Sequence, residues 1–171
     1  MKTKRPDKVF NFEDKPHVMI VEGRFYDDVS DMQLKGAQAV LDRAGASYVV
    51  YTVPGALEIP AAIAYAVKSM DFDAVRRRFD GYIALGCVLQ GETKHADIVA
   101  RESASGLQNL CLQHVLAVGN GIITAESHEQ ALERANPAGE DRGGAAAEAC
   151  LCMVELKCGF NLSPKRRWIA R

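Results

Sequence analysis

The sequence has almost no net charge and no long hydrophobic segment. Its 21 basic residues nearly balance its 22 acidic residues, and the formal charge of -1 gives no electrostatic footprint for nucleic acid or an anionic membrane. The longest apolar runs, such as GYIALGCVL, are far shorter than the roughly 20 residues that cross a bilayer, and residues 1–16 contain no apolar signal core. We therefore expect a cytoplasmic protein that holds any anionic ligand in a local site.

The cysteines also lack the patterns of disulfide-rich and metal-binding proteins. They are five in number, which is odd, and none is spaced as C-x-x-C. They are Cys87, Cys111, Cys150, Cys152 and Cys158, and most of them lie in apolar surroundings. This pattern favours reduced, buried thiols over disulfides or metal ligands, and we expect no metal site.

Short buried-strand patterns and helical patterns alternate along the chain. Apolar, β-branched segments typical of parallel strands occur at 17–23, 47–53, 81–93 and 116–124, the third running into a polar loop. Helical segments follow them at 27–45, before 70, at 95–115, at 127–135 and at 143–160. The pattern predicts an α/β fold, a three-layer α/β/α sandwich with a four-stranded parallel sheet flanked by helices. We expect a flexible arm at 1–16 and a single domain at 17–171.

In such a sheet, ligands bind beyond the carboxyl ends of the strands. This rule selects four stretches: GRFYDD at 23–28, VPGALEIP at 53–60, CVLQGETKH at 87–95 and NGIITAESHEQ at 120–130. Candidate functional residues are therefore sought in these loops.

The third stretch combines a possible phosphate loop with a histidine. Glycines and a helix N-terminus suit a phosphate, with the Thr93 hydroxyl as an extra donor. His95 beside such a site suits general acid-base chemistry near neutral pH. In the other interpretation, Thr93 is a plain helix cap and His95 an exposed first-turn residue. The local sequence leaves both open.

The other stretches offer a carboxylate, an aromatic ring and two arginines. Glu58 lies in an apolar segment, where it either accepts hydrogen bonds from a ligand or begins a helix favourably. Phe25 directly follows a strand and can stack on a heterocycle or fill the core. Arg134 and Arg142 can each bind an anion, although most surface arginines bind no ligand.

Taken together and in this order, five motifs resemble the lumazine synthase family of riboflavin biosynthesis: GRFYDD, VPGALEIP, ALGCVLQGETKHADIV, GNGIITAESHEQALERA and DRGG. The resemblance implies a flavodoxin-like fold. It implies a transferase that condenses 5-amino-6-(D-ribitylamino)uracil with 3,4-dihydroxy-2-butanone 4-phosphate to 6,7-dimethyl-8-ribityllumazine, releasing phosphate and water. It implies no cofactor, and a homopentamer with active sites between adjacent subunits.

The resemblance also implies residue roles. Phe25 is expected to stack on the pyrimidinedione ring, His95 to transfer protons and Arg134 to bind the phosphate of the second substrate. The other implied substrate contacts are Ala56, Leu57 and Glu58 for the ring and ribityl chain, Cys87, Val88 and Leu89 in the same pocket, Glu92 and Thr93 in the phosphate loop, Asn120 across the subunit boundary, and Arg142 where relatives often have lysine.

Several residues depart from the family pattern and keep alternatives open. Gln90, Ala96 and Tyr26 stand where an arginine, an aromatic residue and an asparagine are common, and Gln90 removes a charge beside the phosphate loop. Gln90 and Ala96 favour an alternative function, a catalytically weak paralogue that binds or stores a flavin or lumazine. A third possibility is a structural shell subunit. The amino-terminal arm and the charged connector at 73–80 favour a pentamer over a shell.

Overall fold

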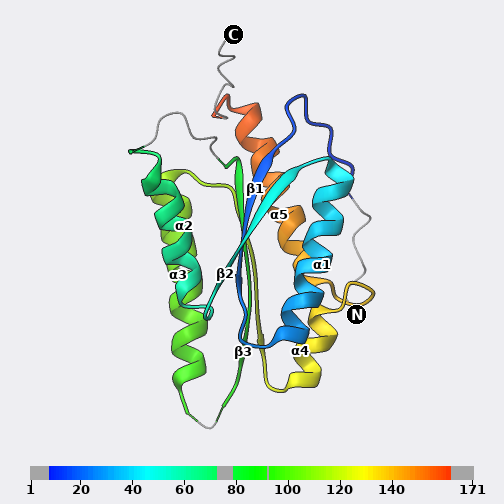
Figure 1. Ribbon diagram of the computed structural model, residues 1–171, viewed down its shortest axis with the longest axis vertical. Helices are drawn as coiled ribbons and strands as arrows, with labels where there is room; N and C mark the ends of the chain where they lie inside the picture. The colour runs from blue at the N-terminus through cyan, green and yellow to red at the C-terminus, as the bar shows by residue number, and fades with distance from the viewer. Residues whose placement is uncertain (1–7, 73–78, 92, 163–171) are drawn as a thin grey trace.

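One parallel sheet with helices on both faces organises the chain (Figure 1). The computed structural model describes residues 8–72, 79–91 and 93–162. The strands are β1 (His17–Gly23), β2 (Ser47–Val53), β3 (Gly81–Leu89) and β4 (Val118–Ala125). The helices are α1 (Asp27–Ala44), α2 (Glu58–Ser69), α3 (His95–His114), α4 (His128–Ala135) and α5 (Arg142–Gly159).

The strand order is β2-β1-β3-β4, and every neighbouring pair is parallel. Strand β3 is buried along its length except for its last residue, because it lies inside the sheet and is covered on both faces. Its continuous apolar run predicts a buried strand, and the structure has a buried strand at this position. The predicted four-stranded parallel sheet is confirmed, and the observed strand order is that of flavodoxin-like folds.

The two faces of the sheet bury separate apolar clusters. Successive side chains of a strand point to opposite faces, so Ile20 packs in one cluster and Val21 in the other. The cluster around Ile20 includes Leu41 of α1 and Leu151 of α5, and the cluster around Val21 includes Ile59 of α2. Figure 1 shows α2 and α3 on one side of the sheet and α1, α4 and α5 on the other. The predicted three-layer sandwich is confirmed.

Helix α5 lies unusually close to strand β4. A Cβ atom built on Gly119 would lie 1.9 Å from the carbonyl oxygen of Ala146 and 3.2 Å from the Cβ of Cys150. Only glycine at position 119 and small residues on the facing side of α5 permit this approach. The contact presses the α5 layer against the edge strand of the sheet.

The segment before β1 contributes to the core. The rings of Phe10 and Phe12 stack with their centroids 5.8 Å apart, and both residues are buried in the cluster that contains Ile20. Residues 1–7 and 73–78 lie outside the described part of the chain, so the arm and the connector are described only in part. The domain boundary at residue 16 stays a prediction.

The cysteines lie in different environments. All five carry free thiols; Cys87 and Cys150 are buried, whereas Cys158 is exposed. Within residues 8–72, 79–91 and 93–162, no three His, Cys, Asp or Glu side chains are grouped so as to hold a metal ion. None of the helices described here combines the length and apolar character that a membrane crossing requires.

Candidate active site

A pocket of about 410 Å³ lies where β1, β2 and β3 end. We call it the Phe25 pocket. It is lined by Phe25, Tyr26, Pro54, Gly55, Ala56, Leu57, Glu58, Cys87, Val88, Leu89, Gly91, Thr93, His95, Ala96 and Val99. The structure thus brings together nine residues that the sequence proposed as site residues, from three of the four selected loops.

The loops after β1 and β2 meet through their backbones. A Cβ atom on Gly23 would lie only 2.7 Å from the carbonyl carbon of Gly55, so no larger residue fits at position 23 without movement. The backbone N–H of Arg24 donates to the carbonyl oxygen of Val53 at 3.2 Å. These contacts bring Phe25 into the same pocket as Ala56.

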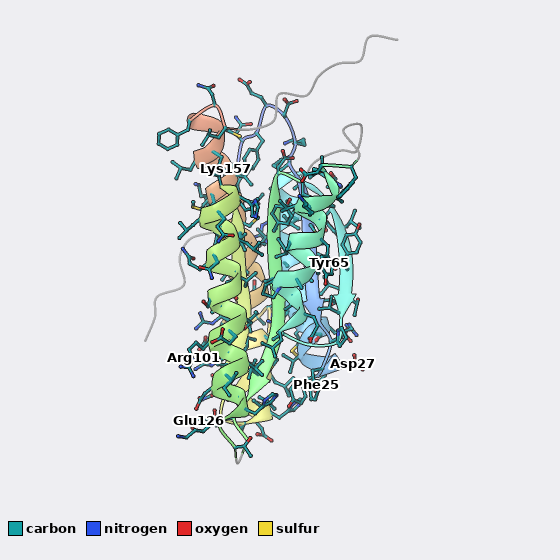
Figure 2. All side chains as sticks on the ribbon, turned by 90° about the vertical axis from the view of Figure 1, so that its left-hand side faces the viewer. Phe25, Asp27, Tyr65, Arg101, Glu126 and Lys157 are labelled. Carbon is teal, nitrogen blue, oxygen red and sulfur yellow. The ribbon has the colours of Figure 1, made fainter. Side chains whose placement is uncertain are left out.

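The Phe25 ring stands outside the core. The residue is 71% exposed and lies edge-on to the Tyr26 ring, with centroids 5.0 Å apart. Figure 2 shows Phe25 at the same end of the molecule as Asp27 and Glu126, opposite the end that carries Lys157. Since the ring fills no core volume, its apolar face is available to stack on a flat ligand.

His95 is both an exposed first-turn residue and a pocket residue. It is the first residue of α3, and it lines the Phe25 pocket. Its backbone N–H donates to Thr93 Oγ1 at 3.4 Å, although the N-cap residue of α3 is Lys94 rather than Thr93. His95 is thus an exposed first-turn residue, and its role in proton transfer stays a prediction. Glu92, the other proposed phosphate-loop residue, lies outside the described residues.

Glu58 and Cys87 give the pocket one polar and one apolar side. Glu58 is exposed at the first position of α2, where an acidic residue is favourable, and it lines the pocket. Its contact with a ligand stays a prediction. Burial, together with the negative charge of Asp28, raises the pKa of the Cys87 thiol to about 11. At neutral pH Cys87 is therefore an uncharged part of the wall.

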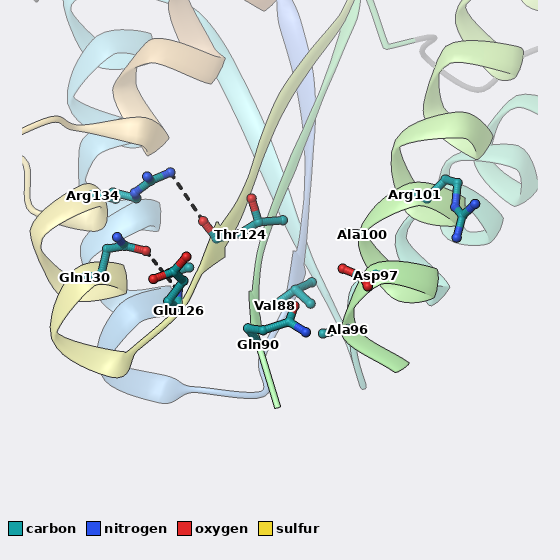
Figure 3. Close-up of a pocket in the computed structure, with 11 residues that line it drawn as sticks. Val88, Gln90, Ala96, Asp97, Ala100, Arg101, Thr124, Glu126, Gln130 and Arg134 are labelled. Carbon is teal, nitrogen blue, oxygen red and sulfur yellow. Dashed lines mark hydrogen bonds between the residues drawn. The ribbon is translucent and has the colours of Figure 1, made fainter. Parts of the chain in front are cut away.

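A second cavity of about 690 Å³ adjoins the Phe25 pocket, because Val88 and Ala96 line both. We call it the Arg134 cavity. Figure 3 shows Arg134 and Gln130 of α4 on one side, and Arg101 and Asp97 of α3 on the other. Its remaining lining residues are Gln90, Ala100, Thr124, Ala125 and Glu126. Arg134 Nη1 donates to the carbonyl oxygen of Thr124 at 3.3 Å.

Three proposed site residues do not line the Phe25 pocket of their own chain. Asn120 is exposed on β4, where its Oδ1 accepts from the N–H of Ile122 at 3.0 Å. Arg134 lines only the adjoining cavity. Arg142, at the start of α5, contacts the Glu140 carboxylate through Nε at 3.1 Å and Nη2 at 3.0 Å. All three belong to the edge strand β4 or to the helices that follow it.

The sequence reasoning missed some pocket residues. Tyr26 and Ala96 were treated only as departures from a family pattern, although both line the Phe25 pocket. Val99 also lines the pocket, and it lies four residues after His95 on α3. Helix geometry places residues at i and i+4 on one face, so His95 itself was the signal that points to Val99.

Known proteins match the chain over nearly its whole described length. The model of the family described as 6,7-dimethyl-8-ribityllumazine synthase matches residues 15–158. The 6,7-dimethyl-8-ribityllumazine synthase of Bartonella tribocorum is 54% identical over 147 residues, covering 86% of this chain and 93% of that protein. That of Agrobacterium fabrum is 53% identical over 143 residues, covering 84% and 95%. The 6,7-dimethyl-8-ribityllumazine synthase 1 of Rhizobium meliloti is 55% identical over 141 residues, covering 82% and 91%.

Proposed function

Because the chain belongs to the 6,7-dimethyl-8-ribityllumazine synthase family, we propose that it condenses 5-amino-6-(D-ribitylamino)uracil with 3,4-dihydroxy-2-butanone 4-phosphate to form 6,7-dimethyl-8-ribityllumazine. The observation that carries the proposal is the convergence of Phe25, Glu58 and His95 in one pocket at the strand ends. An aromatic ring, a carboxylate and a titratable group suit a flat polar heterocycle that loses and gains protons.

The reaction proceeds through an imine. The pyrimidine amine attacks the ketone of the second substrate, and one water leaves as the imine forms. Phosphate is then eliminated, and attack of the ribitylamino nitrogen on the remaining carbonyl group closes the ring with loss of a second water. Much of the acceleration comes from holding both substrates in one site, which can lower the barrier by about 7–11 kcal/mol. His95 transfers protons during these steps, a role typically worth about a hundred- to ten-thousand-fold in rate.

Each pocket residue has a proposed task. Phe25 stacks on the pyrimidinedione ring, and Glu58 with the backbone of Ala56 and Leu57 binds its polar groups and ribityl chain. The uncharged Cys87 thiol, with Val88 and Leu89, closes the apolar side of the pocket. Glu92 and Thr93 belong to the proposed phosphate loop.

The family implies an oligomer with small-molecule substrates, and a cytoplasmic homopentamer is our specific proposal. Asn120, Arg134 and Arg142 do not line the Phe25 pocket of their own chain, which supports the idea that they complete the pocket of a neighbouring subunit. Arg134 then binds the substrate phosphate. Mass measurement in solution tests the pentamer, and cell fractionation tests the location.

Mixing two inactive variants tests the shared site. If His95 and Arg134 of one active site come from different subunits, unfolded and co-refolded His95→Ala and Arg134→Ala chains should regain activity in about one quarter of their sites. Either variant refolded alone should keep only its own strongly reduced activity. Failure of the mixture to exceed the separate variants would contradict a site shared between subunits.

The main test is formation of a fluorescent lumazine from the two substrates. His95→Ala should slow turnover by about a hundred- to ten-thousand-fold while pyrimidine binding persists. His114→Ala, at the other end of the same helix, is the matched control and should keep native turnover. Loss of pyrimidine binding with unchanged turnover at saturation would show that His95 has a different role. Binding of flavin or lumazine without turnover by the native chain would favour the storage paralogue.

A further inference from the structure

The turn between β1 and α1 carries a network of charged side chains beside Phe25. Arg24 Nε donates to Glu22 Oε1 at 3.1 Å, and Nη1 donates to Asp27 Oδ1 at 3.1 Å. Its Nη2 donates to Asp31 Oδ1. A single guanidinium therefore joins the end of the strand to the first two turns of the helix, across the turn that holds Phe25.

Glu22 is the buried end of this network. Its side chain is only 5% exposed, against 81% for Asp27 and 68% for Asp31. Glu22 Oε1 also accepts a hydrogen bond from Thr52 Oγ1 of β2 at 2.8 Å. Exposed ion pairs contribute little, whereas a buried carboxylate depends on its partners. The contact between Glu22 and Arg24 therefore dominates the network.

The backbone of this turn has little freedom to move without moving Phe25. Arg24 is tied to β2 by its N–H bond to Val53, and the N–H of Phe25 donates to the carbonyl oxygen of Gly23 at 3.1 Å. On the other side, Gly23 packs directly on the backbone of Gly55. If the Arg24 backbone moves, the Phe25 ring therefore moves with it. The position of the ring relative to the loop before α2 then changes.

We propose that Arg24 is a positioning residue for the pyrimidine substrate. By joining Glu22 to the first turns of α1, its guanidinium holds the Phe25 ring in a position where it can stack on a pyrimidine bound in the pocket. Phe25 is 71% exposed, so packing around the ring contributes little to this placement. The inference rests on the proposed function and adds a residue that touches no substrate itself. Lysine cannot replace Arg24, because an ammonium group lacks the planar fork that contacts several carboxylates at once.

A double-mutant cycle with Phe25 tests the proposal. The dissociation constant of 5-amino-6-(D-ribitylamino)uracil is measured by titration calorimetry for Arg24→Met in the native and the Phe25→Leu backgrounds. In the native background we expect the dissociation constant to rise about tenfold. This is about the contribution of one charge-assisted hydrogen bond, which is lost with the guanidinium. In the Phe25→Leu background the same change should alter binding by less than about twofold, because the ring that Arg24 positions is gone.

Further variants separate positioning from general destabilisation. Arg43→Met, an exposed arginine in the last turn of α1, is the matched control and should bind the pyrimidine as the native chain does. Arg24→Lys should restore only part of the lost affinity. Should Arg24→Met fail to fold, Glu22→Gln, which keeps the shape and removes the charge, replaces it in the same cycle.

The outcomes distinguish this inference from the proposed function. Equal losses of affinity in both backgrounds, or native affinity in Arg24→Met, would overturn the positioning role. A native chain that binds the pyrimidine but forms no lumazine would overturn the proposed reaction and leave the cycle interpretable. A native chain that does not bind the pyrimidine would overturn both.

Discussion

Replacing Phe25 by alanine is expected to weaken pyrimidine binding while leaving the fold almost as stable. The side chain is 71% exposed, so its removal leaves no core cavity. We therefore expect the free energy of unfolding to fall by less than about 1 kcal/mol. A stacking residue and a core residue are distinguished by this combination of effects.

The loss of affinity follows from the area that a bound ring would cover. A ligand that covers about half of the exposed ring removes roughly 70 Å² of apolar surface from water. At about 25 cal/mol per Å², this burial contributes about 1.8 kcal/mol. Stacking geometry adds about 0.5–1.5 kcal/mol. Phe25→Ala should therefore lose about 2.3–3.3 kcal/mol, which corresponds to a dissociation constant roughly 50- to 200-fold higher.

Titration calorimetry with 5-amino-6-(D-ribitylamino)uracil measures this change, and urea unfolding measures stability. Phe160→Ala is the matched control, because Phe160 is 69% exposed but lies at the end of α5, away from the pocket. It should bind the pyrimidine with native affinity. Native affinity in Phe25→Ala, or an equal loss in both variants, would refute the stacking role.

Three further predictions concern packing and ionisation. Gly119→Ala should destabilise the fold by at least about 2 kcal/mol in urea unfolding, because its Cβ would lie 1.9 Å from Ala146 O; native stability would contradict the close approach of α5. Cys87, with a pKa raised to about 11 by burial, stays protonated below that pH. Iodoacetamide at pH 8 should therefore modify exposed Cys158 first, as read by mass spectrometry, and faster labelling of Cys87 would contradict its burial. The hydrogen bond from His128 at 2.7 Å lowers the pKa of Asp28. This pair stabilises the fold above the unfolded pKa of about 4, and the contribution is lost as pH falls through the folded pKa. His128→Asn should raise the pKa of Asp28 in a carboxyl NMR titration, and an unchanged value would show that the bond is absent in solution.

Much of the fold could be predicted because its signals are local. The apolar run of β3 indicates a strand covered on both faces, and the apolar spacing of α1 with a glycine after it indicates a helix and its end. The burial of Phe10 and Phe12 was not foreseen. Their segment is charged and polar on average, and only the folded arrangement reveals the apolar surface that covers them.

The part of the candidate site that lies directly beyond the carboxyl ends of the strands could be predicted from the sequence. The rule selects the loops of Phe25, Glu58 and His95 without any knowledge of strand order. It also selects 120–130, but Asn120 lies near the start of β4, well before the strand ends at Ala125, and it does not line the Phe25 pocket. The network around Arg24 could not be predicted from the sequence, because it includes Glu22. The approach of Thr52 to Glu22 depends on the pairing of β2 with β1.

The partition between the two cavities is formed by Val88 and Ala96. Position 96 carries a single methyl group there, so any enlargement of that side chain takes space from both compartments at once. A substitution at position 96 that changes the Phe25 pocket therefore also changes the Arg134 cavity.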